Sequence, residues 1–209
     1  MATFCLVHGA WHGGWAWDPL RAELEARGHD VVAPDLPCDD CGAGVEEYAA
    51  CVRDALGGVD DAVVLGHSLG GLTIPLVPAR LRVFLCALVA GTGWKDVFVP
   101  GFGDARVRDE LGRSFYPEPA DAARELQYPS GSTALAARLR PQAPVDSDAR
   151  RPAGPAVYVV CARDAVIRPE WQRHLAHDVL GVEAIELDAG HSPMLSHPRE
   201  LAELLDGLA

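Results

Sequence analysis

The chain has 209 residues, of which 49% are apolar, and its acidic side chains outnumber the basic ones to give a formal net charge of −12 at pH 7. This length fits a single domain with a substantial core. The 21 glycines and 16 prolines indicate a compact chain with many loops. Nucleic acids and anionic membrane surfaces would repel such an acidic protein, so we expect neither as a partner.

Apolar runs and helical periodicity alternate along most of the chain. Strands are predicted at 3–7, 30–33, 61–65, 82–89, 156–161 and 183–187, and helices at 19–27, 45–56, 120–125, 133–139, 170–180 and 198–208. A further helix should follow Ser68, kink at Pro75 and end near Pro78. Because the strands are apolar throughout, we expect a parallel sheet covered on both faces. The predicted fold is therefore α/β, with about six mostly parallel strands flanked by helices.

The stretch 91–150 departs from this alternation, since prolines interrupt it repeatedly. A long irregular insertion in a compact domain is typical of a lid or binding segment. We therefore expect a core made of 1–90 and 151–209 and a short lid at 91–150. Aromatic residues of the lid are candidates to line a pocket, because a lid presents an apolar underside to its site. They are Trp94, Phe98, Phe102, Phe115, Tyr116 and Tyr128.

The six cysteines indicate free thiols rather than disulfides. Cys5, Cys86 and Cys161 lie in predicted strands, where a thiol behaves as a small apolar group. Cys38 and Cys41 have C-x-x-C spacing, but no second pair completes a zinc site. The N-terminus lacks the pattern of a secretory leader, and no window reaches the length of a membrane span. We therefore expect a cytoplasmic protein with reduced thiols.

The run 63–71, Val-Val-Leu-Gly-His-Ser-Leu-Gly-Gly, places a serine between an apolar strand and a helix-compatible segment. This context is that of a nucleophile elbow. The turn would hold Ser68 in a strained backbone conformation, which Gly66 and Gly70 permit because neither has a Cβ that could clash. Ser68 is the candidate nucleophile.

A serine hydroxyl needs an adjacent base, and that base needs an orienting carboxylate. In a parallel sheet such groups lie beyond the carboxyl ends of the strands. His191 is the histidine in the loop directly after the last predicted strand. Asp164 follows the fifth strand and lies between Ser68 and His191 in chain order, as this fold requires. Asp188 competes with Asp164 but lies too near His191 in sequence to be favoured.

These motifs resemble those of the α/β-hydrolases, and in particular of the small family of plant methylesterases and hydroxynitrile lyases with its bacterial relatives. The resemblance runs nearly end to end. It is carried by His-Gly-Ala-Trp-His-Gly-Gly-Trp at 8–15, Pro-Asp-Leu-Pro at 34–37, Gly-His-Ser-Leu-Gly-Gly at 66–71, Asp164 with Ile167, and Gly-His-Ser-Pro-Met-Leu at 190–195.

The resemblance implies an α/β-hydrolase fold in which Ser68 is the nucleophile, His191 the base and Asp164 its orienting acid. It also implies an oxyanion hole formed by the backbone N–H groups of Ala10 and Leu69, which agrees with the position of Leu69 directly after the nucleophile.

Two departures from the family pattern disfavour a lyase. The hydroxynitrile lyases of this family carry a lysine directly after the catalytic histidine, where this chain has Ser192. They also carry a threonine in the oxyanion loop, where this chain has Ala10. The insertion is shorter than in the plant enzymes.

The activity expected is that of a serine esterase which cleaves a small, mostly apolar carboxylic ester, a methyl or short acyl ester, without a cofactor. Thioesterase, lactonase and hydroxynitrile lyase activities are alternatives, as is a small-molecule receptor that retains the triad. The spacing of His8, His12 and His67 matches no familiar zinc pattern, so no metal is expected. His12 could shape the pocket or form hydrogen bonds in the oxyanion loop. The candidate pocket residues are His12, Trp94, Phe115, Tyr116 and Met194, whereas Trp11, Trp15 and Trp17 are expected in the core. The sequence leaves open whether the protein forms a homodimer.

Overall fold

The computed structural model describes residues 1–92, 96–145 and 152–209. Its main feature is a sheet of six parallel strands in the order β2-β1-β3-β4-β7-β8. The strands are β1 (Thr3–Val7), β2 (Asp30–Val32), β3 (Val63–His67), β4 (Leu81–Leu85), β7 (Ala156–Cys161) and β8 (Ala184–Leu187). The expected mostly parallel sheet of about six strands is confirmed.

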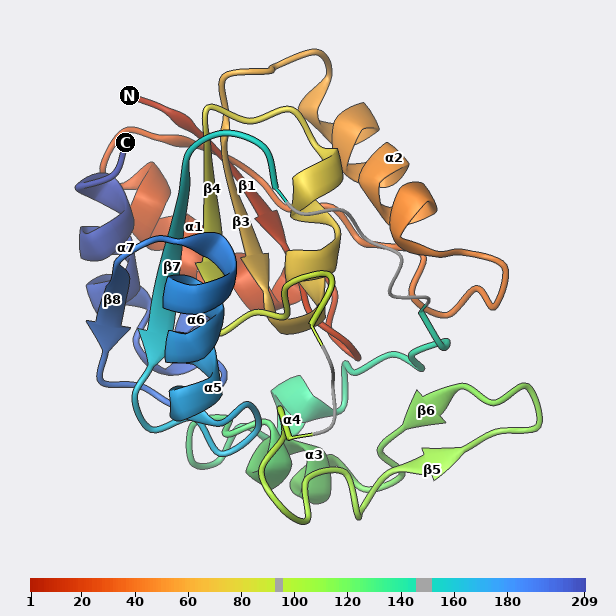
Figure 1. The fold of residues 1–209 in the computed structure, drawn as a ribbon. Helices are drawn as coiled ribbons and strands as arrows, with labels where there is room; N and C mark the ends of the chain where they lie inside the picture. Colours follow the sequence, from red (N-terminus) through yellow and green to blue (C-terminus); the bar gives the residue numbers. More distant parts are fainter. Residues whose placement is uncertain (93–95, 146–151) are drawn as a thin grey trace.

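The α-helices and the short helical segments labelled η lie on both faces of this sheet and at the ends of its strands. In chain order they are η1 (Gly14–Trp17), α1 (Asp18–Glu25), α2 (Val45–Leu56), η2 (Ser68–Leu72), η3 (Ile74–Leu76), α3 (Pro119–Glu125), α4 (Thr133–Ala136), α5 (Pro169–His174), η4 (Leu175–Leu180), α6 (Pro193–Ser196) and α7 (Pro198–Asp206). α1 and α7 pack against each other near the two chain termini (Figure 1).

The four inner strands, β1, β3, β4 and β7, bury side chains on both faces of the sheet, because successive residues of a strand point to opposite sides. In β1, Phe4 and Leu6 belong to one apolar cluster and Cys5 and Val7 to another. Helices α1 and α7 complete the first cluster, and α2 with η4 completes the second. This two-sided burial accounts for inner strands in which apolar residues run consecutively rather than alternating with polar ones.

The insertion lies beside the carboxyl ends of the strands, where the arrowheads point in Figure 1. Its described part holds α3, α4 and an antiparallel hairpin of β5 (Val107–Arg108) and β6 (Ser114–Phe115). Backbone bonds tie it to the core loops: Arg140 N–H donates to the Trp11 carbonyl at 2.9 Å, and Ala143 N–H to the Cys38 carbonyl at 2.7 Å. The insertion therefore covers the edge of the sheet at which ligands bind in such folds.

Three predicted elements differ from the observed ones. The helix expected after Ser68 consists of two short 3₁₀ helices, η2 and η3, with Pro75 at the start of the second. The fourth strand ends at Leu85, because Cys86 adopts a φ of +36° and turns the chain out of the sheet. The predicted helix 170–180 changes from α-helical to π-helical at Leu175.

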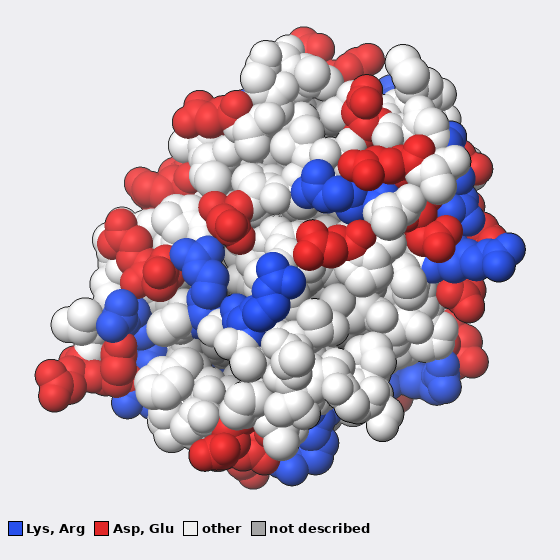
Figure 2. All heavy atoms as spheres, turned by 180° about the vertical axis from the view of Figure 1, so that it is seen from behind, with Lys and Arg blue, Asp and Glu red and all other residues white. Residues whose placement is uncertain are grey.

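The molecular surface mixes charges of both signs. Figure 2 shows acidic and basic side chains interspersed over the face that is hidden in Figure 1. None of the helices in the described residues combines the length and the hydropathy that a membrane span requires.

Candidate active site

Ser68 lies at the turn between β3 and η2 with a φ of +51°, a left-handed conformation that is unusual for a residue other than glycine. The chain passes close to itself on both sides of this turn. A Cβ at Gly66 would lie 2.8 Å from the Gly70 carbonyl oxygen, and one at Gly70 would lie 2.6 Å from the Val7 carbonyl oxygen. The predicted elbow is thus present, and both glycines are needed because no side chain fits there.

A chain of hydrogen bonds joins Ser68 to the two residues expected to act with it. His191 Nε2 lies 3.1 Å from Ser68 Oγ, and His191 Nδ1 lies 2.8 Å from Asp164 Oδ2. Since a carboxylate accepts, Nδ1 carries the proton, and Nε2 is free to accept the serine proton. The side chains of His191 and Asp164 are nearly inaccessible to solvent. The structure therefore brings together the three residues selected from the sequence.

Asp164 is held by donors on both of its oxygens. Val166 N–H and Ile167 N–H donate to Oδ1 at 2.7 and 3.0 Å, and Gln172 Nε2 donates to Oδ2 at 2.8 Å. Gln172 is itself anchored, since its Oε1 accepts a bond from Cys161 N–H. These hydrogen bonds fix the direction in which the carboxylate faces His191.

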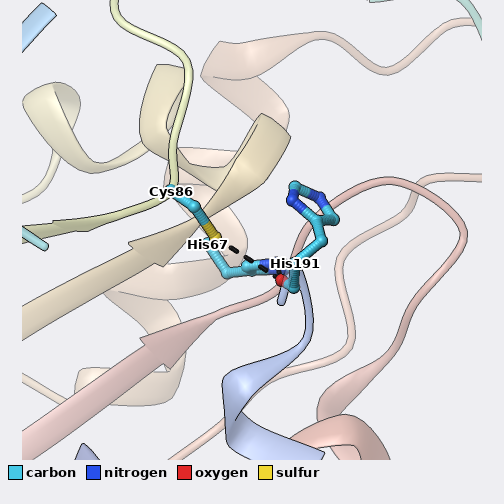
Figure 3. A group of neighbouring side chains, drawn as sticks. All are labelled: His67, Cys86 and His191. Carbon is cyan, nitrogen blue, oxygen red and sulfur yellow. Dashed lines mark hydrogen bonds between the residues drawn. The ribbon is translucent and has the colours of Figure 1, made fainter. Parts of the chain in front are cut away.

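The backbone of His191 is held by a buried histidine and a buried cysteine (Figure 3). His67 Nε2 donates to the His191 carbonyl oxygen at 2.7 Å, and Cys86 Sγ lies 3.4 Å from the same oxygen. Burial lowers the pKa of His67 well below its usual value and raises the pKa of the Cys86 thiol well above its own. Both groups are thus neutral donors.

His67, Cys86 and His191 also form a cluster whose potential ligand atoms lie within 4.8 Å of one another. A metal would need free ligand atoms there. Both ring nitrogens of His191 already bond to Ser68 and Asp164, and His67 Nε2 carries the proton that it donates, so His67 Nδ1 and the Cys86 sulfur are the only ligand atoms left in the cluster, too few to hold a metal. The cluster is therefore better explained as support for the His191 loop than as a metal site.

Two backbone donors face the space beside Ser68. Ala10 and Leu69 both line the cavity described below, and their N–H groups have no acceptor among the described residues. His8 Nδ1 bonds the Gly9 carbonyl oxygen at 2.8 Å. Because the carbonyl and N–H of one peptide point in opposite directions, this bond also orients the Ala10 N–H. Such a pair of free donors next to a nucleophile suits a tetrahedral oxyanion.

A cavity of about 240 Å³ opens beside Ser68. Its apolar lining includes Trp11, Leu69, Leu88, Phe98, Phe102 and Val166. An engineered cavity of about 150 Å³ holds a benzene molecule, so this one accommodates a group somewhat larger than a single ring. Phe98 and Phe102 are thus pocket residues, in line with the role expected of aromatic residues in the insertion. Trp11, expected in the core, also lines the cavity, because its φ of +64° turns it toward the insertion.

Those pocket residues singled out from the sequence that the structure describes lie outside the cavity wall. His12 is buried behind the oxyanion loop, where Nδ1 bonds the Ala10 carbonyl and Nε2 bonds the hydroxyl of Tyr128. Met194 is fully buried in the core, and Tyr116 packs edge-on against Trp11. Phe115 also lies outside the cavity wall, and Trp94 falls outside the described residues. The pocket assignments of Phe115, Tyr116 and Met194 are corrected, whereas His12 takes its alternative role, a hydrogen bond in the oxyanion loop. Long-range packing rather than local pattern decides which side chains reach the cavity.

Sequence reasoning missed Gln127, which connects the insertion to both catalytic loops. Its Oε1 accepts bonds from Ala165 N–H at 2.6 Å and His191 N–H at 2.9 Å, and its Nε2 donates to the Arg163 carbonyl at 2.8 Å. Gln127 has a φ of +54°, so the chain adopts an unusual conformation to place this amide. The sequence gives only a weak indication of this role, because Gln127 is a single polar residue between two short helices of the insertion.

Replacing Gln127 with alanine is expected to lower kcat of ester hydrolysis by about 10-fold, because two N–H groups of the catalytic loops lose their acceptor and the loops loosen. Gln127→Glu keeps an acceptor oxygen for the two N–H groups but loses the donor to the Arg163 carbonyl, so it should retain more activity than Gln127→Ala and less than the unmodified protein. Steady-state kinetics with one ester tests this, with Arg199→Gln on α7 as a surface control. Equal activity of Gln127→Ala and the unmodified protein would contradict this positioning role.

The parallel sheet, the strained serine at its elbow, and the histidine and aspartate bonded to it define an α/β-hydrolase. The sequence pattern of the Alpha/beta hydrolase family matches residues 6–204. The chain therefore belongs to this family.

Individual relatives match along almost the whole chain. Salicylic acid-binding protein 2 of Nicotiana tabacum is 30% identical, and the match covers 97% of this chain and 95% of that protein. Methylesterase 3 of Arabidopsis thaliana is 27% identical, with 96% and 93% covered. The crystal structure of a pyrethroid hydrolase from Sphingobium faniae JZ-2 superposes with a TM-score of 0.80 at 25% identity, covering 99% of this chain and 96% of the other. The expected resemblance to the methylesterases is confirmed.

Proposed function

We propose that this protein hydrolyses a small carboxylic ester, a methyl or short acyl ester, through an acyl-enzyme formed on Ser68. As a class it is a carboxylic ester hydrolase, since relatives that match its full length are named methylesterases. The observation that carries the proposal is the chain of hydrogen bonds from Asp164 through His191 to Ser68 beside a cavity of about 240 Å³.

In the proposed reaction, Ser68 Oγ attacks the ester carbonyl while His191 Nε2 takes its proton. The oxyanion that forms is stabilised by the Ala10 and Leu69 N–H groups. His191 then protonates the leaving alcohol, and the acyl group stays on Ser68. Water, deprotonated by His191, attacks this acyl-enzyme and releases the acid. The insertion 91–150 acts as a lid in this scheme, because its Phe98 and Phe102 form part of the cavity wall.

A hydroxynitrile lyase is disfavoured by the environment of Ser192. This residue is fully buried, and its Oγ donates to the Leu126 carbonyl at 2.6 Å, so it points toward the insertion. It does not line the cavity and carries no charge that could stabilise departing cyanide. Hydrolysis needs no such charge, because His191 can protonate the leaving oxygen.

The test combines active-site labelling with a substrate panel. A fluorophosphonate probe is expected to label the unmodified protein and the Ser196→Ala control, but not Ser68→Ala. Among p-nitrophenyl and methyl esters, kcat/KM should be highest for short acyl groups and fall once the acyl chain exceeds the cavity. Multiple turnovers distinguish an enzyme from a receptor that keeps the triad. Labelling that survives in Ser68→Ala, or cyanide release from mandelonitrile without hydrolysis of any ester, would contradict the proposal.

A further inference from the structure

Two arginines line the mostly apolar cavity beside Ser68, whose other polar lining residues are Ser114 and Gln142. Arg106 lies directly before β5 in the chain, and Arg108 ends that strand. Both belong to the insertion, whose described part carries six arginines in all. Arg106 is half-buried and Arg108 is exposed, so both guanidinium groups are accessible to an anion that enters the cavity.

The other four arginines of the described insertion already have carboxylate partners. Their pairs are Arg113 with Asp109, Arg124 with Asp121, Arg138 with Asp18, and Arg140 with Asp39. Among the described residues, no carboxylate lies within ion-pair distance of Arg106 or Arg108. The two arginines that line the cavity are thus the two without a carboxylate partner in this part of the chain, although Arg108 Nη1 donates to the Gly112 carbonyl at 2.8 Å.

The position of Arg106 is fixed by aromatic rings. Its guanidinium carbon lies 4.8 Å from the centre of the Trp11 ring and 5.1 Å from that of Phe102. Its Nε points to the Gly103 carbonyl at 3.4 Å, while neither terminal nitrogen has an acceptor among the described residues. Stacking of this kind holds the planar group in place at little further entropic cost and leaves its fork of donors available.

Arg106 is distant from the catalytic residues along the chain, but it lines the same cavity as Ser68. Trp11, on which it stacks, directly follows Ala10, whose N–H is one of the two proposed oxyanion donors. A molecule that places its ester carbonyl at Ser68 can therefore place a second group at Arg106 within the same small cavity.

We propose that the substrate is an ester that carries a free carboxylate, such as a monoester of a short dicarboxylic acid, and that Arg106 with Arg108 binds this carboxylate. The inference rests on the proposed esterase function and narrows its substrate class. Guanidinium groups bind carboxylates through paired N–H donors. The apolar wall of the cavity accommodates the hydrocarbon between the two acid groups, and the reaction at Ser68 is unchanged.

Matched ester pairs test this inference. The unmodified protein should hydrolyse monomethyl succinate with a kcat/KM at least equal to that for dimethyl succinate, despite its net charge of −12. In Arg106→Gln the ratio of monoester to diester kcat/KM should fall by about 10- to 100-fold, as expected when a hydrogen-bonded charge loses its partner. Arg108→Gln should lower the ratio less, because Arg108 is more exposed. A second pair tests whether the carboxylate belongs to the alcohol half of the substrate instead. The kcat/KM for cleavage of the acetyl ester is compared between O-acetylglycolate, which has a free carboxylate on its alcohol half, and its methyl ester.

Arg138→Gln is the matched control. Arg138 stacks on Trp15 at 4.9 Å in the same way, but it lies outside the cavity wall, so its loss should leave the ratio unchanged. A purely structural role of Arg106 would lower hydrolysis of both esters equally and keep the ratio constant, which would overturn the inference. Arg106→Lys keeps the positive charge but loses the paired N–H donors of the guanidinium. This variant should retain part of the preference for the monoester over the diester.

A binding measurement separates this inference from the proposed function. In a Ser68→Ala background no turnover occurs, and calorimetric titration with monomethyl succinate should show a Kd that rises about 10- to 100-fold on adding Arg106→Gln. If esters are hydrolysed but neither the ratio nor this Kd depends on Arg106, the carboxylate site is refuted and the esterase stands. If no ester is hydrolysed, the proposed function fails, and the titration still decides the inference.

Discussion

Replacing Ser68 with alanine is expected to lower kcat of ester hydrolysis by about 10⁴- to 10⁶-fold, and replacing His191 with alanine should cost about as much. The reason is that His191 Nε2 bonds Ser68 Oγ at 3.1 Å, so neither residue can act in the reaction without the other. The double variant should therefore be no slower than either single one. Single-turnover kinetics on a p-nitrophenyl ester measures the rates.

Asp164→Asn extends this test to the third residue. An amide at this position can donate to His191 Nδ1 and stabilise the tautomer that carries its proton on Nε2, which cannot accept the serine proton. We expect a loss of about 10⁴-fold in kcat with the fold intact.

A different result for the double variant would contradict the joint action of Ser68 and His191. In that case the double variant would be slower than the unmodified protein by the product of the two single effects.

The elbow and its partners were predictable because the features that encode them are local. A β-branched strand leads into Gly66, and the glycines on either side of Ser68 allow an approach that any Cβ would block. The strands were predicted from continuous apolar runs, which the observed sheet explains by burial on both faces. Asp164 and His191 were predicted because each lies in the loop that follows a parallel strand. The carboxyl ends of parallel strands lie at the same edge of the sheet, so residues in these loops come close together.

The cavity wall was harder to predict because it depends on contacts between distant segments. Met194 has an apolar side chain close to His191 in sequence, yet it packs into the core. Gln127 lies in an irregular segment, and its importance appears only when its amide is seen between the loops of Asp164 and His191. Arg106 resembles any surface arginine until the hairpin places it over Trp11. The spacing of apolar residues along the chain does not show which distant segments contact each other.

The protein is expected to lose stability steeply below about pH 6.5, because it buries three histidines in neutral form. Burial lowers the pKa of His8 to about 4, that of His12 to about 3, and that of His67 well below its usual value. In the unfolded chain these side chains bind protons near an ordinary pKa of about 6.5. Between that pH and the native pKa values the unfolded state binds more protons, so the free energy of unfolding falls as the pH falls.

Each buried histidine contributes a slope of about 1.4 kcal/mol per pH unit in this window, so three of them remove about 6 kcal/mol by pH 5. That is comparable to the whole stability of many single domains, which ranges from about 5 to 15 kcal/mol. Urea unfolding at a series of pH values from 8 to 5 measures the slope. The loss should be reversible on returning to pH 7, since only proton binding changes.

His12→Asn tests the assignment, because asparagine can still donate to the Ala10 carbonyl and cannot take up a proton at this pH. We expect this variant to be less stable than the unmodified protein at pH 8, where the bond to Tyr128 is lost, but to show a slope about 1.4 kcal/mol per pH unit smaller between pH 6 and 5. His177→Asn is the control, since that side chain is 80% exposed and its replacement should keep the slope. A free energy of unfolding that stays constant from pH 6.5 to 5 would contradict the neutral state that burial gives His8, His12 and His67 in the folded protein.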